Sequence, residues 1–122
     1  MNVKRLQRRR NRRVAVVGSL AEARAVLSAA AGRPVVLVSP PRAASYLGVG
    51  FFRALIDAAR TEYPGVAVEA VMDCGDAPGF ALSALRMGFT TIVLGGDPRA
   101  RARVAAIARA SGARLLARAP RR

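Results

Sequence analysis

Two carboxylates and the only thiol of the chain lie within four residues, in the run Asp73-Cys74-Gly75-Asp76. Two neighbouring carboxylates can raise the pKa of one of them, which then serves as a general acid or base. Cys74, as a thiolate, is a candidate zinc ligand. The alternative interpretation is structural, because Asp76 lies two residues before Pro78 and is a candidate N-cap of a helix. The run predicts either a catalytic pair, Asp73 and Cys74, or a capped helix start.

Histidine, the commonest metal ligand and general base in proteins, is absent from the chain. Cys74 is the only cysteine, which excludes an intramolecular disulfide and a zinc motif built from several Cys and His residues. A lone thiol beside Asp73 and Asp76 lacks a second soft ligand for zinc. We therefore expect no metal site and no cofactor.

Two further segments carry residues suited to ligand binding. These candidates are Ser39, Arg42, Tyr46, Gly95 and Gly96. The glycine pair precedes a predicted helix and can hold a phosphate through backbone N–H groups, although Asp97 places a negative charge nearby. The other three residues lie in a long loop after a strand, and such loops are often functional. The alternative is a structural loop with Tyr46 packed over the strand ends.

Apolar, β-branched segments predict the strands that position these candidates. The predicted strands are residues 14–17, 34–38, 66–72, 90–94 and 113–117. Helices are predicted between them, the first opened by a Ser19/Glu22 capping box and the last by Asp97-Pro98. Strands joined by helices of this length are normally parallel, with right-handed crossovers, and function collects at their carboxyl ends.

The pattern predicts an α/β fold of five parallel strands alternating with helices, which is either half-TIM-barrel-like or a flavodoxin-like doubly wound sheet. Periodicity does not separate the two arrangements. In a half-barrel the helices cover only the outer face, so the apolar inner face would meet water at about 25 cal/mol per Å². A second copy could cover it with two-fold symmetry, so the half-barrel predicts a homodimer. A doubly wound sheet needs no partner.

Three segments resemble the class II, metal-dependent fructose-bisphosphate and tagatose-bisphosphate aldolases. They are Asp73-Cys74-Gly75, residues 84–90 (ALRMGFT) and residues 94–96 (LGG). The family has an Asp-His-Gly turn, an Ile-Arg-x-Gly-Phe-Thr-Ser-like run and a strand ending in Asp-Gly-Ser. The resemblance implies the first half of a TIM barrel over residues 19–116, with Asp73 at the catalytic acid/base position. Cys74 stands at the position of a metal-binding His, and Gly95 at that of a second Asp.

The formal net charge is +14, and 20 of the 21 cationic residues are Arg. Seven cations fall within residues 1–13, so residues 14–122 carry +7. They are Lys4, Arg5, Arg8, Arg9, Arg10, Arg12 and Arg13. We predict that residues 1–13 form a disordered arm that contacts phosphates, and that residues 14–122 form one α/β domain. The alternative is a solvated tail in a chain whose Arg content reflects a GC-rich genome.

These observations predict a non-catalytic, aldolase-derived α/β binding or regulatory module whose arm contacts a polyanion, either nucleic acid or an acidic partner. The alternative is a small enzyme, lyase-like or acid/base, that uses Asp73 and Cys74 at the strand ends. We predict that Cys74 is accessible at the carboxyl ends of the strands, because it lies in the turn after the third strand and not within an apolar run. No stretch has the roughly 18–20 apolar residues of a membrane helix, so we expect no membrane contact and a cytoplasmic location.

Overall fold

The computed structural model describes residues 11–121. Its elements are β1 (Arg13–Val16), α2 (Leu20–Ser28), β2 (Val35–Val38), α3 (Ala43–Tyr46), α4 (Val49–Glu62), β3 (Val68–Asp73), α5 (Pro78–Arg86), β4 (Thr91–Val93), α6 (Pro98–Ala110) and β5 (Arg114–Leu116). All five predicted strands are present, each within two residues of its predicted bounds. The segment predicted as a loop after β2 contains the short helix α3.

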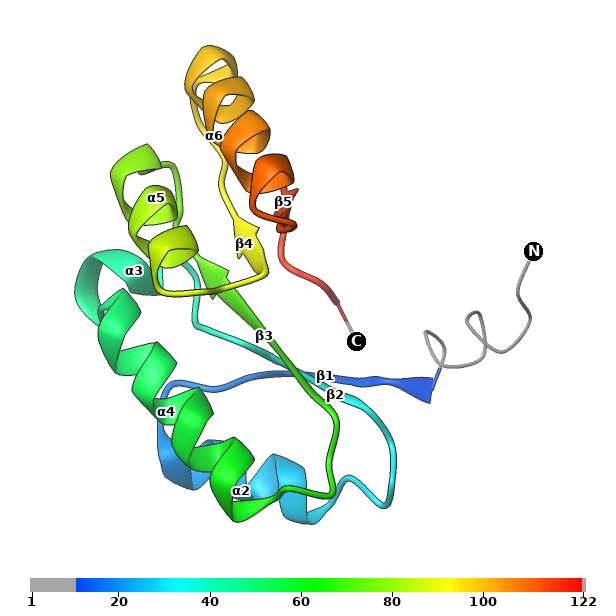
Figure 1. Ribbon diagram of the computed structural model, residues 1–122. Helices are drawn as coiled ribbons and strands as arrows, with labels where there is room; N and C mark the ends of the chain where they lie inside the picture. Colours follow the sequence, from blue (N-terminus) through cyan, green and yellow to red (C-terminus); the bar gives the residue numbers. More distant parts are fainter. Residues whose placement is uncertain (1–10, 122) are drawn as a thin grey trace, which may run out of the picture.

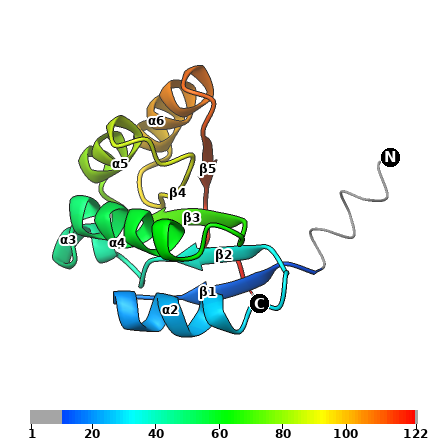
Figure 2. The same cartoon turned by 60° about the horizontal axis from the view of Figure 1, so that its bottom comes forward.

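The five strands form one parallel sheet in the order β1-β2-β3-β4-β5. Each strand lies beside its predecessor, as in a (β/α)₈ barrel, whereas the flavodoxin-like order is 2-1-3-4-5. Right-handed crossovers in this order bring every helix to the same face. Figures 1 and 2 show the helices together on one side of a curved sheet. The half-barrel alternative is therefore the observed one, and the doubly wound alternative is wrong.

Alternate residues of each strand point toward the helix layer. Leu37, Met72 and Ile92 lie fully buried there, in one cluster with Phe52 and Ile56 of α4. Burial of a side chain of this size contributes about 1.5–3 kcal/mol. These contacts hold α4 against the centre of the sheet.

The other face of the sheet, which is the inner face of the half-barrel, carries a second apolar cluster. It consists of Val14, Val36, Val38, Val71 and Val93. These valines are only 0–7% exposed, and Leu116 and Ala119 pack against them. The segment after β5 runs back along this side of the sheet (Figure 1). The predicted exposure of the inner face is therefore wrong for these five valines, whereas Val16, which lies beside Val38 on this face, is 55% exposed.

Two of the predicted helix caps are confirmed. The Ser19 hydroxyl accepts a hydrogen bond from the Glu22 N–H at 3.2 Å, and the Glu22 carboxylate accepts one from the Gly18 N–H at 3.0 Å. Before α6, the Asp97 carboxylate accepts a hydrogen bond from the Ala100 N–H at 3.0 Å. These bonds satisfy amide groups that have no acceptor within the helix.

The predicted arm is described only at its end. Lys4, Arg5, Arg8, Arg9 and Arg10 lie outside the described residues. Arg13 belongs to β1, opposite Val35 of β2, so the sheet begins one residue before the predicted domain boundary. No helix among residues 11–121 is long and apolar enough to cross a membrane, and the cytoplasmic location stays a prediction.

Candidate functional site

The carboxyl ends of β2 and β3 bring two predicted site residues into contact. The Ser39 hydroxyl accepts a hydrogen bond from the Asp73 N–H at 2.8 Å, across 34 positions of sequence. Ser39 is almost fully buried. Its hydroxyl therefore joins the ends of two neighbouring strands and is not presented to a ligand.

Asp73, at the position of the family's catalytic acid/base, ends β3 and faces the inside of the half-barrel. It lies opposite Val93, which belongs to the inner-face cluster. One carboxylate oxygen of Asp73 accepts a hydrogen bond from the Gly75 N–H at 2.9 Å, which fixes the turn after the strand. Within the described residues no Lys or Arg forms a salt bridge with this carboxylate.

Cys74 lies on the opposite side of the sheet from Asp73. Its side chain is only 2% exposed and belongs to the cluster under the helices. Burial, and secondarily the negative charge of Asp73, raises the pKa of the thiol to about 12. A buried thiol that keeps its proton near neutral pH is poorly suited to act as a nucleophile or a metal ligand. The predicted accessibility of Cys74 is wrong, because successive residues at the end of β3 point to opposite faces.

We expect native Cys74 to react very slowly with Ellman's reagent at pH 8. A pKa about three units above the ordinary value lowers the thiolate fraction about 10³-fold, and burial blocks access as well. The rate in 6 M guanidinium chloride provides the reference. Rapid labelling of the native chain would place the thiol at the rim.

The raised pKa of the Cys74 thiol predicts that the stability of the fold depends on pH. Because the folded thiol binds its proton more tightly than the unfolded one, its stabilising contribution is fully present below pH 9 and is lost as pH rises toward 12. The variant Cys74→Ala should not show this loss of stability at alkaline pH. Comparing the free energies of unfolding of the two proteins across this pH range therefore separates the effect of Cys74 from that of other titrating groups.

The loops after β3 and β4 are in direct contact. The Gly95 N–H donates a hydrogen bond to the Gly75 carbonyl at 2.7 Å. Gly96 has φ +82°, and a Cβ there would lie 2.8 Å from the Cβ of Asp76, so only glycine fits this contact. The Gly95 amide is thus already engaged, which does not support the predicted phosphate site at the glycine pair.

Three other predicted roles at this rim also change. Ala77, not Asp76, is the N-cap of α5, and no side chain caps this helix. Arg42 lies over the loop after β3, with its Cγ 3.0 Å from the place that a Cβ on Gly75 would occupy. Tyr46 is 65% exposed and does not pack over the strand ends. The rim, which is the edge of the sheet at the carboxyl ends of the strands, therefore contains Ser39, Arg42, Asp73 and the glycine pair. Cys74 and Tyr46 do not contribute to it.

The donor set at this rim does not fit a divalent metal. No group of three or more His, Cys, Asp or Glu side chains is arranged to bind a metal within residues 11–121. The chain has no His, and the thiol at the position of the family's metal-binding His is buried and protonated. Asp73 instead uses a carboxylate oxygen to hold its own turn.

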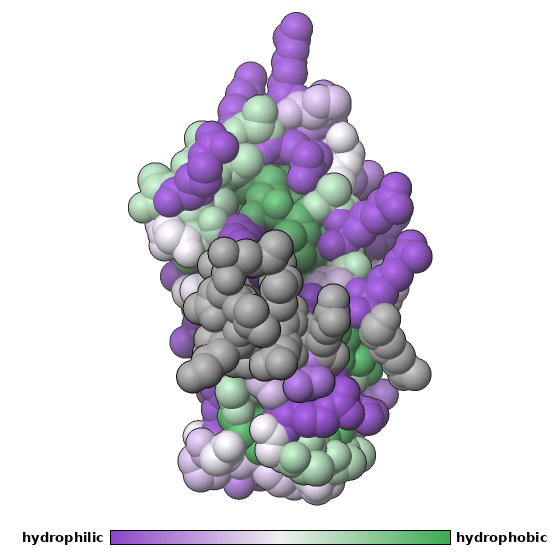
Figure 3. Space-filling model, turned by 90° about the vertical axis from the view of Figure 1, so that its right-hand side faces the viewer, coloured by the Kyte–Doolittle hydropathy of each residue, from purple (hydrophilic) through white to green (hydrophobic). Residues whose placement is uncertain are grey.

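An arginine cluster at the amino ends of the strands was not predicted from the sequence. Arg12 and Arg114 both pair with the carboxylate of Glu69, at 3.8 and 3.4 Å. Beside them the Arg33 Nε donates a hydrogen bond to the Asn11 carbonyl at 2.8 Å. We call Arg12, Arg33, Arg114 and Glu69 the amino-end cluster. Figure 3 shows one side of the molecule, on which hydrophilic side chains project around an apolar area.

No protein-family model matches the chain. It is 36% identical over 92 residues to the fructose-bisphosphate aldolase of Nostoc sp., which covers 74% of this chain and 26% of that protein. It is 36% identical over 73 residues to the class 2 fructose-bisphosphate aldolase of Synechocystis sp., covering 60% of this chain and 20% of the relative. The aldolase of Pseudomonas aeruginosa is 32% identical over 85 residues, covering 68% of this chain and 24% of the relative.

The chain thus spans about a quarter of the length of the curated relatives that it matches. The consecutive order of its parallel strands is the order of a TIM barrel, as the resemblance implied. The sequence similarity and the strand order are together consistent with a partial chain similar to fructose-bisphosphate aldolases, in which Cys74 stands where the resemblance implies a His.

Proposed function

We propose that this chain is a non-catalytic, aldolase-derived binding module that contacts nucleic acid through its basic residues. The observation that carries the proposal is the amino-end cluster, in which Arg12 and Arg114 pair with the one carboxylate of Glu69 and Arg33 lies beside them. Residues 1–10, which carry five further cations, directly precede Asn11 and Arg12 in the sequence. The excess of positive charge is therefore concentrated where the arm begins.

Recognition of backbone phosphates by such a surface requires positive charge and little shape complementarity. Lys and Arg side chains that neutralise backbone phosphates release condensed counterions, and this binding is independent of base sequence. Arg is suited to the role because its planar guanidinium donates two hydrogen bonds to one phosphate. The side chains of Arg12 and Arg114 are 33% and 54% exposed, so both can reach a ligand.

The test compares the full chain with a version that starts at Asn11, on a random-sequence DNA duplex and on single-stranded RNA. The shorter version keeps β1 and the amino-end cluster intact, since the strand begins at Arg13. The control is the full chain with Arg99→Gln, Arg103→Gln and Arg109→Gln on α6. We expect weaker binding from the shorter version and nearly unchanged binding from the control. Equal affinities of the full and shorter chains would contradict the proposal.

The enzymatic alternative receives no support from the geometry. Asp73 and Cys74 lie on opposite faces of the sheet, which supports the non-catalytic proposal over joint action of the two side chains on one substrate. We accordingly expect no cleavage of fructose 1,6-bisphosphate, the substrate that the names of the relatives suggest, with or without added zinc or cobalt. The assay couples the triose products to a dehydrogenase. Turnover that disappears in Asp73→Asn would overturn this expectation.

We also propose that the chain forms a homodimer. The buried inner valines leave less apolar area for a partner than the sequence suggested. The proposal is now supported by the sheet edges, since in the described sheet β1 and β5 each pair with one strand only. Val16 of β1 is 55% exposed beside such an edge, and open edges of this kind favour pairing with another chain.

Sedimentation at micromolar concentration, in salt high enough to remove nucleic acid, should show twice the mass of the 12.8 kDa chain. Val16→Asp should shift the protein to monomer, while Ile107→Asp on the exposed surface of α6 should leave the dimer intact. A monomer in the unsubstituted chain would contradict the proposal.

A further inference from the structure

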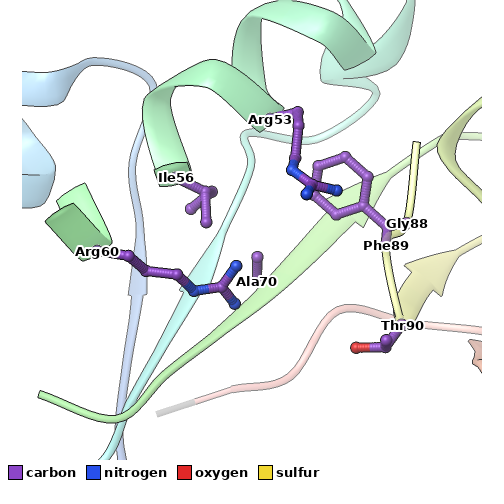
Figure 4. Close-up of a pocket in the computed structure, with 7 residues that line it drawn as sticks. All are labelled: Arg53, Ile56, Arg60, Ala70, Gly88, Phe89 and Thr90. Carbon is purple, nitrogen blue, oxygen red and sulfur yellow. The ribbon is translucent and has the colours of Figure 1, made fainter. Parts of the chain in front are cut away.

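A small pocket lies between α4 and the amino ends of β3 and β4, on the helix side of the sheet. Its lining consists of Arg53, Ile56, Arg60, Ala70, Gly88, Phe89 and Thr90, and its volume is about 130 Å³. Figure 4 shows Arg53 and Arg60 reaching from α4 toward β3 and the segment from Gly88 to Thr90. The pocket lies at the end of the sheet opposite to Ser39 and Asp73, so it is separate from the rim described above.

The two arginines line the same pocket because they are seven residues apart on one helix. This spacing is two helical turns, about 10.5 Å along the axis, and places both side chains on the same face. The Arg60 Nη2 donates a hydrogen bond to the Val68 carbonyl at 2.9 Å, and Arg53 Nη1 donates to the Met87 carbonyl. Both guanidinium groups are therefore held in position by backbone.

The close approach of the Arg53 guanidinium to the end of α5 depends on Gly88. Gly88 has φ +87°, and a Cβ there would lie 2.8 Å from Arg53 Nη1. A glycine at this turn thus leaves room for the guanidinium against the end of α5.

Charge at the pocket is not fully neutralised. Arg53 Nε pairs with Asp57 at 3.1 Å. Arg60 forms no salt bridge with any described residue, and its Nε and Nη1 donate to no described acceptor. Two guanidinium groups against one carboxylate leave a net positive charge, and the hydroxyl of Thr90 adds a neutral donor.

The size of the pocket restricts its ligand to a small group. Pockets for whole metabolites have volumes of roughly 300–1,000 Å³, so about 130 Å³ admits one anionic group with a few waters. Two guanidinium groups approaching from different directions suit the tetrahedral oxygens of a phosphate better than a planar carboxylate. Ile56, Ala70 and Phe89 provide apolar walls, which strengthen the charge interaction.

We propose that this pocket binds a phosphate group through Arg60 and Arg53. The group belongs either to a free phosphate compound or to the backbone of a nucleic acid. The pocket is lined by residues between Arg53 and Thr90, so its recognition does not depend on residues 1–13.

The test uses the full chain with inorganic phosphate, a mononucleotide and a single-stranded DNA oligomer as separate probes, each titrated by calorimetry. Arg60→Gln should weaken phosphate binding about 10-fold or more, because charge-assisted bonds are lost. Arg60→Lys, which keeps the charge but loses the planar fork, should recover only part of the affinity. Arg103→Gln on α6 removes the same charge elsewhere and should have no effect.

The three probes distinguish the two possible sources of the phosphate group, a free phosphate compound and the backbone of a nucleic acid. A loss limited to inorganic phosphate and the mononucleotide assigns the site to a free phosphate compound, and a loss with all three probes assigns it to nucleic acid as well. Equal losses in Arg60→Gln and Arg103→Gln, or no loss in either, would overturn the proposal. The result for this pocket is independent of the comparison between the full chain and the version that starts at Asn11, because every variant used here retains residues 1–13.

A second measurement needs no substitution, in case Arg60→Gln unfolds the chain. Phenylglyoxal modification of the full chain, mapped by mass spectrometry, should slow at Arg60 in the presence of phosphate and stay unchanged at Arg103. Equal rates at Arg60 with and without phosphate would overturn the proposal.

Discussion

The affinity of the full chain for a random-sequence DNA duplex is expected to fall about 10⁴-fold when monovalent salt rises from 50 to 200 mM. The reason is the seven cations of residues 1–13. If each neutralises one phosphate, the logarithm of the affinity falls with the logarithm of salt concentration at a slope of about −6. Fluorescence anisotropy of a labelled duplex across a salt series measures this slope directly.

The version that starts at Asn11 provides the comparison. It loses five of the seven cations and keeps Arg12 and Arg13. Two remaining phosphate contacts correspond to a slope of about −1.8, or about a 10-fold fall over the same salt range. The chain with three α6 arginines changed to Gln should keep the steep slope. Equal slopes for the full and shorter chains would show that the arm does not contact phosphates.

Phe52→Ala is expected to lower the free energy of unfolding by about 3–5 kcal/mol. Phe52 is fully buried, and its ring stacks on Phe89 with centroids 6.0 Å apart and planes 15° apart. This stack joins α4 to the segment that links α5 to β4. Natural domains have only about 5–15 kcal/mol of stability, so the substitution removes a large part of it. Urea unfolding followed by circular dichroism gives the value.

The neighbouring residue supplies a matched control. Phe51 has the same side chain on the same helix, but it is 53% exposed. Phe51→Ala should change the free energy of unfolding by no more than about 0.5 kcal/mol, because surface substitutions rarely do more. Equal destabilisation by both substitutions would mean that the assignment of the two faces of α4 is wrong.

Local features of the fold were predicted correctly because their causes are local. The strands follow from short apolar, β-branched runs, and the caps at Ser19 and Asp97 follow from side chains that accept from an amide three residues away. Asp76 failed as a cap because the helix begins after Ala77, and its position is decided by contact with Gly96.

The side of the sheet that Cys74 faces could not be predicted from composition. The predicted strand ended at Met72, with Cys74 in the turn, but β3 continues to Asp73 and its alternation carries on. A shift of one residue moves a side chain to the other face of a sheet. One residue of strand therefore separates an accessible rim thiol from a buried one.

By itself, the sequence determined the class of the fold, the positions of its strands and helices, the relation to the aldolases and the absence of His. These properties depend on residue types and on spacings of a few residues. The tertiary structure alone decided the order of the strands, the cover over the inner valines, the amino-end cluster and the pocket at Arg53 and Arg60. Each of these joins residues from distant parts of the chain, such as Arg12, Glu69 and Arg114. The physical reason is that sheet register and helix packing, which set such contacts, arise from interactions across the whole domain.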